Sequence, residues 1–250
     1  MSSSTTPNSL ASLGALITGG GSGIGLATAR LLLEQGARVV ISGRDANKLA
    51  AALATLNHGG RAHAVAGDGS KPADATRIAA EATALLGSID LLVANAGANI
   101  KERTLAELDA TRWQTMLDNN LNAAFHTLQA VLPGMRQRHS GLVVVINSIA
   151  GKRGNPLGGP AYVAAKFALH GLITAAAVEE KPNGIRFSSI YPGEVNTPIL
   201  EARPNPVTDA HKQGILQPED VAQAVLFIAS LPPRASVPEL IISPSSYAFI

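Results

Sequence analysis

Short apolar runs that end in or near glycine alternate with helix-like segments along almost the whole chain. The first two runs, "GALITGG" (14–20) and "ARVVISG" (37–43), have the continuous apolar character of strands buried on both faces. Between them, "GIGLATARLLLEQG" (23–36) spaces its apolar residues as a helix does and stops at Gly36. Parallel strands need a crossover of this kind, so the alternation predicts an α/β fold.

The alternation continues through the rest of the sequence and indicates about seven strands. Further strands are expected at 61–67, 90–97, 141–148, 184–193 and 238–244, and further helices at 74–87, from about Leu105 to Arg138, around Tyr162 and Lys166, and at 218–231. We therefore expect one doubly wound (Rossmann) parallel sheet with helices on both faces. No linker interrupts it, so we expect a single domain over 13–250, preceded by a disordered tail over 1–12.

Composition excludes several classes of protein. Apolar residues form 46% of the chain, there are no cysteines, and the net charge of +2 contains no Lys/Arg run. We therefore expect no disulfide or thiolate chemistry and no nucleic-acid partner. The six histidines lack metal-ligand spacing, so no metal is expected. The N-terminus lacks signal-peptide features, and no apolar stretch is expected to approach the roughly 18 residues of a membrane span, so we expect a cytoplasmic protein without a membrane partner.

A glycine-rich segment, "TGGGSGIG" (18–25), joins the first strand to its helix. Such glycines permit a tight turn and let backbone N–H groups approach a pyrophosphate at the helix N-terminus. The spacing is G-x-x-x-G-x-G, at Gly19, Gly23 and Gly25, rather than G-x-G-x-x-G. A plain structural turn is the alternative, and the position between strand and helix favours a nucleotide site. "NAG" (95–97) ends the fourth strand, where ligands of such sheets collect, although an ordinary turn would look the same.

Tyr162 and Lys166 lie four residues apart in "AYVAAKFAL" (161–169) and share one face of a helix. A free phenol, with a pKa of about 10, is a poor acid or base near neutrality. A nearby ammonium lowers that pKa by favouring the phenolate, so the pair makes sense as an acid/base device. A surface lysine beside a half-buried tyrosine is the alternative. Ser148 at the end of the preceding strand and Asn120 in the long helix favour the acid/base interpretation.

From about Leu13 onward the chain closely resembles the short-chain dehydrogenase/reductase family, in its single-domain branch. The resemblance rests on "TGGGSGIG", "NAG", "NNLN", "INSIAG", "YVAAK" and "YPGEVNTP", in the family's order and approximate spacing. It implies that Ser148 holds the substrate oxygen, Tyr162 exchanges its proton, and Lys166 lowers the tyrosine pKa while binding the nicotinamide ribose. Asn120 would support a water relay to Lys166, although its neighbours Asn119 and Asn122 leave that alignment open.

The resemblance also implies where the cofactor binds. The implied residues are Gly19, Gly21, Ser22, Gly23, Ile24, Gly25, Arg44, Asp68, Gly69, Asn95, Ala96, Gly97, Tyr162, Lys166, Pro192, Gly193, Val195 and Thr197.

The end of the second strand, "VVISGRDANK", bears on the choice of dinucleotide. NAD-preferring relatives carry an acid where this chain has Gly43, and Arg44 follows it. A guanidinium suits a 2′-phosphate, and Ser42 adds a hydroxyl, so we expect NADP(H) rather than NAD(H). Asp45 is the competing acid, and it is better explained as the N-cap of the next helix.

The expected function is an NADP(H)-dependent oxidoreductase that interconverts a secondary alcohol and a ketone. The chain end lacks the "DGG" of ketoacyl-type reductases and looks more like the branch that oxidises 3-hydroxy acids such as serine. A dinucleotide-binding regulator without catalysis is the alternative, but it would need no proton donor. An epimerase or dehydratase of the extended branch would need a longer chain.

Two loops are expected to frame the substrate. The segment 199–214 is interpreted as a mobile lid carrying Glu201, Arg203 and Lys212, and 154–159 as the facing rim, in a stretch slightly longer than the family pattern. The resemblance further implies a homodimer or homotetramer, paired through the helices around 105–138 and 160–180.

Overall fold

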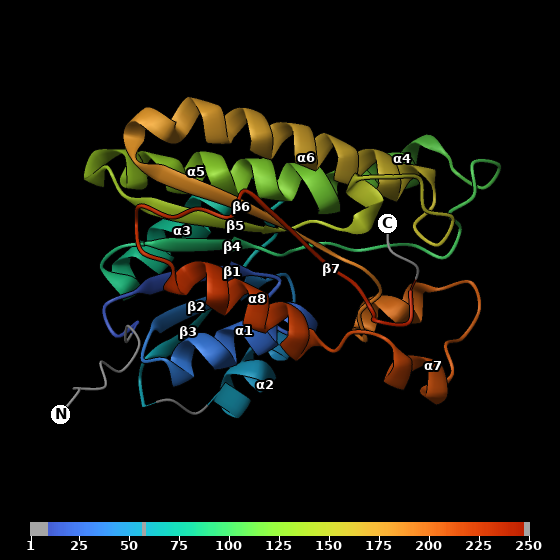
Figure 1. Ribbon diagram of the computed structural model, residues 1–250, viewed down its shortest axis with the longest axis horizontal. Coiled ribbons are helices and arrows are strands. Elements are labelled where there is room, and N and C mark those ends of the chain that lie inside the picture. Colours follow the sequence, from blue (N-terminus) through green and yellow to red (C-terminus); the bar gives the residue numbers. More distant parts are fainter. Residues whose placement is uncertain (1–9, 57–58, 248–250) are drawn as a thin grey trace.

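Seven parallel strands form one sheet in the order β3-β2-β1-β4-β5-β6-β7 within residues 10–56 and 59–247, the part of the chain that this computed structural model describes (Figure 1). Every neighbouring pair is parallel, so each connection crosses back over a face of the sheet. The strands are β1 (Gly14–Thr18), β2 (Arg38–Gly43), β3 (Ala62–Ala66), β4 (Leu91–Ala94), β5 (Gly141–Ile146), β6 (Ile185–Pro192) and β7 (Glu239–Ile242). The predicted seven-stranded Rossmann sheet in a single domain is confirmed.

Helices cover both faces of the sheet. Figure 1 shows α1, α2 and α8 on one side and α3, α5 and α6 on the other, and each group buries its own apolar cluster against the strands. The helices are α1 (Gly23–Glu34), α2 (Ala46–Leu56), α3 (Pro72–Leu86), α4 (Ala110–Leu117), α5 (Ala123–Arg138), α6 (Pro160–Glu180), α7 (Asp209–Gly214) and α8 (Pro218–Ser230). Strands buried on both faces explain why the runs in the sequence are continuously apolar.

The strand order reverses at β1. The chain moves from β1 out to β3 and returns on the other side of β1 to form β4, so the connections after β1 and β4 leave in opposite directions. In open parallel sheets, ligands bind in the crevice that this reversal leaves at the carboxyl ends of the strands. The fold therefore places a ligand site beside the segments that follow Thr18 and Ala94.

The long helical region begins later than predicted and contains an interruption. Helix α4 starts at Ala110 rather than near Leu105, because Asp109 caps it by accepting a hydrogen bond from the backbone N–H of Arg112 (2.8 Å). One turn of π-helix, Asp118–Asn122, then separates α4 from α5. Such wide turns change the direction of side chains within a helix and are frequent at functional sites.

Part of the predicted N-terminal tail packs on the domain. Residues 1–9 lie outside the described residues. Leu10, by contrast, is buried in the core cluster, and its backbone N–H donates to the carbonyl oxygen of Gln35 (3.0 Å).

The expectation that no apolar stretch has the length of a membrane span was wrong for α6. By length and composition alone, the helical stretch Pro160–Asn183 passes that test, with a mean hydropathy of 1.5. Leu169 and Ile173 on this helix belong to the apolar cluster against the sheet, as in any core helix of a Rossmann layer. Only 28% of its most apolar window is buried within the single chain, however, which leaves an apolar face uncovered.

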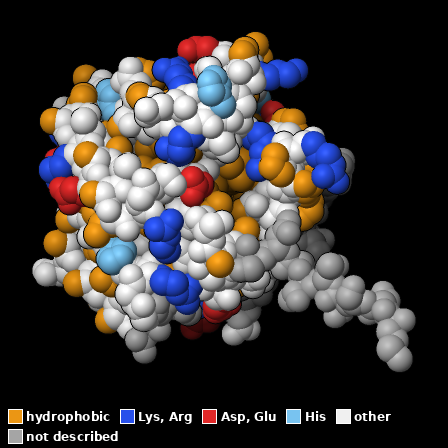
Figure 2. Space-filling view, turned by 90° about the vertical axis from the view of Figure 1, so that its left-hand side faces the viewer, with side chains coloured by type: hydrophobic (Ala, Val, Ile, Leu, Met, Phe, Trp, Pro, Cys, Tyr) orange, Lys and Arg blue, Asp and Glu red, His pale blue; other side chains and the backbone are white. Residues whose placement is uncertain are grey.

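Charges are mixed on the face that Figure 2 shows. Basic and acidic side chains are interspersed there with hydrophobic and uncharged ones, and the basic side chains do not merge into one continuous patch. The whole chain carries 20 Lys and Arg against 18 Asp and Glu. On this face, interspersed charges are typical of an ordinary solvent-exposed surface and differ from the continuous basic patch of a protein that binds polyanions.

Candidate active site

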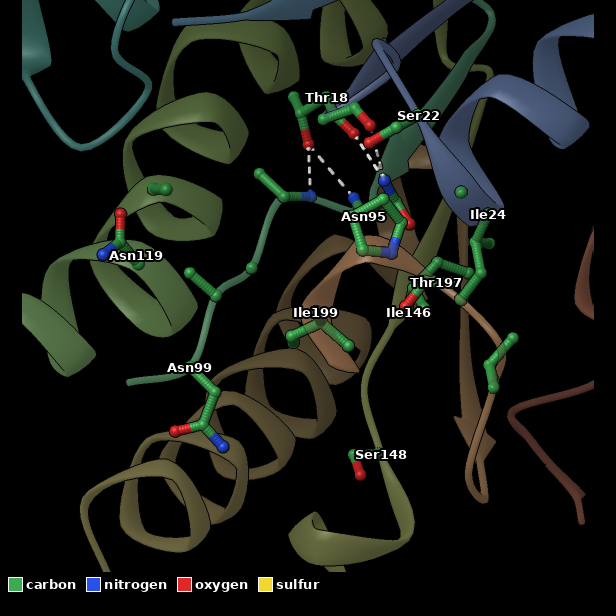
Figure 3. Close-up of a pocket in the computed structure, with 18 of the residues that line it drawn as sticks. Thr18, Ser22, Ile24, Asn95, Asn99, Asn119, Ile146, Ser148, Thr197 and Ile199 are labelled. Atoms are coloured by element: carbon green, nitrogen blue, oxygen red, sulfur yellow. Dashed lines mark hydrogen bonds between the residues drawn. The ribbon is translucent and has the colours of Figure 1, made fainter. Parts of the chain in front are cut away.

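A cavity of about 650 Å³ lies at the carboxyl ends of the strands. It collects the segments after β1, β2, β3, β4, β5 and β6, including nearly all of the residues that the sequence singled out. Among the expected catalytic and cofactor-binding residues, Gly25 and Asn120 are the two that do not line the cavity. Figure 3 shows Thr18 and Ser22 at one end of this cavity and Ser148 and Asn99 at the other.

The glycine-rich turn forms the nucleotide end of the cavity. Gly19 and Gly23 have φ angles of +65° and +52°, in a region of backbone conformation that residues other than glycine rarely adopt. Gly25 supports the turn from behind, since a Cβ there would lie 2.5 Å from the carbonyl oxygen of Gly19. The turn thus needs glycine for its shape, and it leads directly into the N-terminus of α1, where backbone N–H groups attract anions.

Asn95 and Thr18 link the ends of β1 and β4 through hydrogen bonds, at the point where the strand order reverses. The Asn95 side-chain amide donates to the carbonyl oxygens of Thr18 (2.9 Å) and Gly19 (3.1 Å). In return, Thr18 Oγ1 accepts from the backbone N–H groups of Asn95 (3.0 Å) and Ala96 (3.1 Å) (Figure 3). Asn95 therefore lines the cavity and holds the glycine-rich turn in place.

Two cations lie where the second strand ends. Arg44 lines the cavity, and its Nη1 donates to Asn119 Oδ1 (3.1 Å). Asp45 accepts a hydrogen bond from the backbone N–H of Lys48 (3.0 Å), so its interpretation as a helix cap is confirmed. The Lys48 side chain also lines the cavity and passes over the turn, with Cγ 3.4 Å from the position of a Cβ on Gly21. Lys48 could not be singled out from the sequence, where its only signal is its place in the first turn of the helix after Arg44.

Ser148, Tyr162 and Lys166 meet at the other end of the cavity. Ser148 follows β5, and its Oγ accepts from the backbone N–H of Ala150 (3.1 Å), which fixes it at the start of a short 3-10 turn. Tyr162 and Lys166 project from the first two turns of α6, with the ammonium 5.6 Å from the centre of the phenol ring. Lys166 Nζ donates to the carbonyl oxygen of Ile146 (3.1 Å).

Burial shifts the pKa values of Tyr162 and Lys166 in the protein without ligand. Burial raises the pKa of Tyr162, and a hydrogen bond with Ser148 opposes that rise. The expected lowering of the tyrosine pKa by Lys166 is not the dominant effect in this state. Burial also lowers the pKa of Lys166 to about 8, which brings it close to the physiological range. The lysine side chain is only 3% exposed, which agrees with the strong effect.

Asn120 lies directly behind the wall of the cavity. Its amide nitrogen donates to the carbonyl oxygens of Ala98 (2.9 Å) and Met116 (3.0 Å), and its Oδ1 accepts from the N–H of Ala98 (3.2 Å). Asn120 Oδ1 and Lys166 Nζ both lie against Gly97, at 2.9 and 3.8 Å from the position of a Cβ there. Among the three candidate asparagines, this one ties the loop after β4 to the π-helical turn.

The other two asparagines of "NNLN" have different contacts. Asn119 accepts from Arg44, at the opposite end of the cavity, and Asn122 donates to Asp118 (2.7 Å).

The rim (154–159), the lid (199–214) and the segment around Tyr247 enclose the substrate end, and Glu194 connects the lid to Tyr247. Its carboxylate pairs with Arg203 (2.6 Å) and His211 (2.8 Å), both in the predicted lid. It also accepts from the hydroxyl of Tyr247 (2.6 Å), and burial, together with this carboxylate, raises the pKa of that tyrosine to about 12. The predicted lid is therefore fastened over the cavity in this structure.

The three lid residues that the sequence proposed behave differently. Arg203 lines the cavity, whereas Glu201 and Lys212 do not. On the facing rim, Asn155, Leu157 and Gly158 line the cavity as the sequence predicted.

The amino-acid pattern of residues 14–207 matches the family model described as short chain dehydrogenase. The chain belongs to the short-chain dehydrogenase family. It is therefore an oxidoreductase enzyme rather than the non-catalytic regulator considered above, and the cavity with Ser148, Tyr162 and Lys166 is the candidate active site of a dehydrogenase.

Relatives of this short-chain dehydrogenase act on cyclic alcohols according to their names. The chain is 38% identical to cyclohexanol dehydrogenase of Acinetobacter sp. (strain SE19) over 222 residues, which cover 86% of this chain and 87% of that protein. It is 37% identical to cis-4-hydroxycyclohexanecarboxylate dehydrogenase of Sinomonas cyclohexanicum over 223 residues, covering 86% and 88%.

A solved structure shares the whole fold of this dehydrogenase. An alcohol dehydrogenase from the archaeon Thermococcus sibiricus, complexed with 5-hydroxy-NADP, superimposes with a TM-score of 0.84 at 29% identity. The match covers 94% of this chain and 98% of that one.

The nucleotide end of the cavity fits the NAD(P) cofactor of the family. At Gly19 the turn has no room for a side chain, since a Cβ there would lie 3.0 Å from Ala96 Cα, and its glycines let the backbone approach a pyrophosphate. Within the described part of the chain, no three His, Asp or Glu side chains gather into a possible metal-binding group.

Proposed function

We propose that this enzyme interconverts a secondary alcohol and a ketone with NADP(H), and that its substrates include hydroxy acids. The observation that carries the proposal is the placement of Ser148, Tyr162 and Lys166 in the same cavity as the glycine-rich turn. A proton donor and a dinucleotide cradle in one enclosure are what hydride transfer at a carbinol carbon requires. The name of the Sinomonas relative supports the hydroxy acid part of the proposal.

The chain's own residues would handle the proton of the alcohol. When bound, the cofactor supplies a hydride acceptor or donor. In the oxidation direction, Ser148 donates a hydrogen bond to the alcohol oxygen, and the phenolate of Tyr162 takes the hydroxyl proton. In the reduction direction, the Tyr162 phenol returns that proton to the carbonyl oxygen. Lys166 lies beside the phenol with its ammonium, and a protonated Lys166 stabilises the phenolate form.

The preference for NADP rests on Arg44 and Lys48. Both line the nucleotide end of the cavity, and no acid occupies position 43, where glycine stands. Asp45, the nearest acid, is engaged in capping α2. Two cations beside a ribose favour a 2′-phosphate over a hydroxyl, because charge-assisted hydrogen bonds to phosphate are the stronger ones.

Removing either cation is expected to weaken the enzyme's preference for NADP. Arg44→Ala should lower kcat/KM with NADP⁺ by about 10- to 100-fold, since a hydrogen bond to a charged group contributes about 1.5–3 kcal/mol. Lys48→Ala should lower it about tenfold, because an ammonium binds as a point charge. Neither variant should change kcat/KM with NAD⁺ more than about threefold.

Steady-state kinetics with both cofactors measure this selectivity. Arg30→Ala is the matched control, because Arg30 pairs with Glu219 and does not line the cavity. A parent enzyme that prefers NAD⁺, or an Arg44→Ala variant with unchanged selectivity, would contradict the assignment.

We also propose that the enzyme is a homo-oligomer paired through α5 and α6. Large hydrophobic side chains stand exposed on these helices and on α4: Trp113, Phe125, Phe167 and Val178. Small residues on the outer side of α6, such as Ala168 and Ala175, would let a second helix approach closely. Sedimentation at micromolar concentration is expected to give a dimer or tetramer, and Phe167→Glu should shift it towards the monomer. A monomeric parent would contradict the proposal.

The enzymatic proposal is tested with the purified protein and a panel of secondary alcohols and their ketones. Cyclohexanol, 3-hydroxybutyrate and cis-4-hydroxycyclohexanecarboxylate cover neutral and acidic substrates. We expect NADP⁺ reduction with at least one of them and NADPH oxidation with the matching ketone. Turnover that is confined to primary alcohols, or no turnover with any carbinol, would overturn it.

A further inference from the structure

Arg103 is a buried guanidinium at the substrate end of the cavity. Its side chain lines the cavity, and the residue is only 7% exposed. Nη1 donates to the carbonyl oxygen of Leu157 (2.6 Å) in the rim, and Nη2 donates to the carbonyl oxygen of Ala202 in the lid. Nε is buried and has no hydrogen-bond partner. Of the five N–H groups of the guanidinium, two therefore donate hydrogen bonds, and both acceptors are neutral carbonyl oxygens.

No acidic side chain neutralises this charge within residues 10–56 and 59–247. Arg103 takes part in none of the ion pairs found there. Burial lowers its pKa, and the positive charge of Arg203 adds to that effect. Glu194, the carboxylate at this end, is already bound to Arg203. Besides the Lys166 ammonium, the substrate end thus holds two guanidinium groups and one carboxylate, and Arg103 is the guanidinium that lacks an acidic partner. Burying an unpaired charge is unfavourable, and a bound anion would relieve it.

Arg103 is close to the reacting end of the cavity. The carbonyl that accepts from Nη1 belongs to Leu157, and the next residue, Gly158, approaches the candidate catalytic phenol. A Cβ on Gly158 would lie 3.0 Å from Cδ1 of Tyr162. The stem of Arg103 passes Gly159, where a Cβ would lie within 2.9 Å of Arg103 Cβ. The guanidinium and the phenol are therefore placed along the same wall by one short loop.

We infer that Arg103 binds a carboxylate of the substrate, so that the enzyme acts on hydroxy acids rather than on neutral alcohols. The inference rests on the proposed function, because it assigns a second recognition point for the alcohol that Tyr162 deprotonates. The planar fork matches a carboxylate with two parallel hydrogen bonds, and the enclosed setting strengthens them. Arg103 is thus a specificity-determining residue, and Tyr162 remains the group that exchanges the proton.

The experiment compares pairs of secondary alcohols that differ by one carboxylate. cis-4-Hydroxycyclohexanecarboxylate is paired with cyclohexanol, and 3-hydroxybutyrate with 2-butanol. We expect the parent to favour the acid in at least one pair by about 30-fold or more in kcat/KM, which corresponds to about 2 kcal/mol. Arg103→Gln should abolish that preference, chiefly by raising KM for the acid, while kcat/KM for the neutral alcohol stays within about fivefold.

Two further variants separate recognition from a structural role. Arg103→Lys keeps the charge and loses the fork, so part of the preference for the acid should survive. Arg112→Gln is the matched control, because Arg112 pairs with Asp109 and does not line the cavity. It should affect the acid and the neutral alcohol by similar factors. Equal losses for both substrates in Arg103→Gln would show that Arg103 only ties the rim to the lid, and would overturn the inference.

A binding measurement tests Arg103 independently of turnover. Cyclohexanecarboxylate lacks the hydroxyl and cannot react, so its dissociation constant is measured by calorimetry on the protein with NADP⁺. We expect binding to the parent and to Arg112→Gln, and at least tenfold weaker binding to Arg103→Gln. An enzyme that turns over no alcohol but shows this pattern would refute the proposed function and leave the anion site standing. Equal binding to all three proteins, or none, would overturn the anion site.

Discussion

Replacing Tyr162 with phenylalanine is expected to lower kcat by about a thousandfold or more while the fold and cofactor binding persist. The change removes one oxygen atom from a cavity-lining side chain, and with it the hydroxyl that we propose exchanges a proton with the substrate oxygen. General acid–base catalysis contributes about 10²–10⁴-fold, and without the phenol the proton of the substrate hydroxyl has no positioned acceptor. The loss should fall on kcat rather than on KM, because the proton moves in the transition state.

The matched control for this change is Tyr191→Phe. Tyr191 is fully buried, bonds to His170 Nδ1 (2.7 Å) and does not line the cavity, so its hydroxyl should matter to activity by only a few-fold. Kinetics and NADPH titration of both variants are compared with the parent. Tyr162→Phe activity within tenfold of the parent would rule out Tyr162 as the proton donor.

Lys166→Met is expected to make the unliganded protein more stable at neutral pH and nearly inactive. Burial lowers the pKa of Lys166 from 10.5 to about 8, so the charged form is disfavoured in the folded state. A shift of this size corresponds to about 3 kcal/mol, and loss of the hydrogen bond to Ile146 offsets about 1 kcal/mol of it. We expect a net gain of about 2 kcal/mol at pH 7, with kcat/KM lowered at least a hundredfold and weaker NADP binding.

The pH dependence of stability distinguishes this cause from a change in packing. Between pH 8 and 10.5 the unfolded lysine holds a proton that the folded one has released, so the stability of the parent should rise with pH in that window. The Met variant should lose this rise. Urea unfolding at pH 7 and pH 9.5, without cofactor, measures both effects. Lys152→Met, which removes a lysine bound to Glu239 outside the cavity, is the control. A Met variant less stable than the parent at pH 7 would contradict the argument.

The sheet could be predicted from the sequence because the patterns that mark its strands and connecting helices are local. Buried parallel strands such as β1 and β5 are continuously apolar, and the helices between them end at residues with clear turn preferences. The cofactor end could be anticipated for the same reason, since Gly19 and Gly23 carry the turn in their own backbone conformation. Tyr162 and Lys166 could be paired from spacing alone, because four residues make one helical turn.

Only part of the substrate end could be predicted in this way: the rim over 154–159 and Arg203 in the lid line the cavity as expected, but its other polar groups were missed. Arg103, Glu194 and Tyr247 come from three loops far apart in the sequence, and they meet only because the carboxyl ends of the strands converge there. No local pattern marks a loop arginine whose partners are backbone carbonyls of Leu157 and Ala202. The raised pKa of Tyr162 could not be predicted from the sequence either, because the spacing reveals the neighbouring charge of Lys166 but not how deeply the phenol is buried.

The hydrogen bond between Tyr247 and Glu194 has a practical consequence for anyone who handles this enzyme. Tyr247 is three residues from the end of the printed sequence, yet its hydroxyl touches the carboxylate that anchors the lid. An affinity tag fused next to Tyr247 would therefore act like a mutation inside the substrate pocket. Leu10, in contrast, packs beside Gln35 at the far end of α1, away from the glycine-rich turn. Purification handles and immobilisation chemistry belong at that end of the chain.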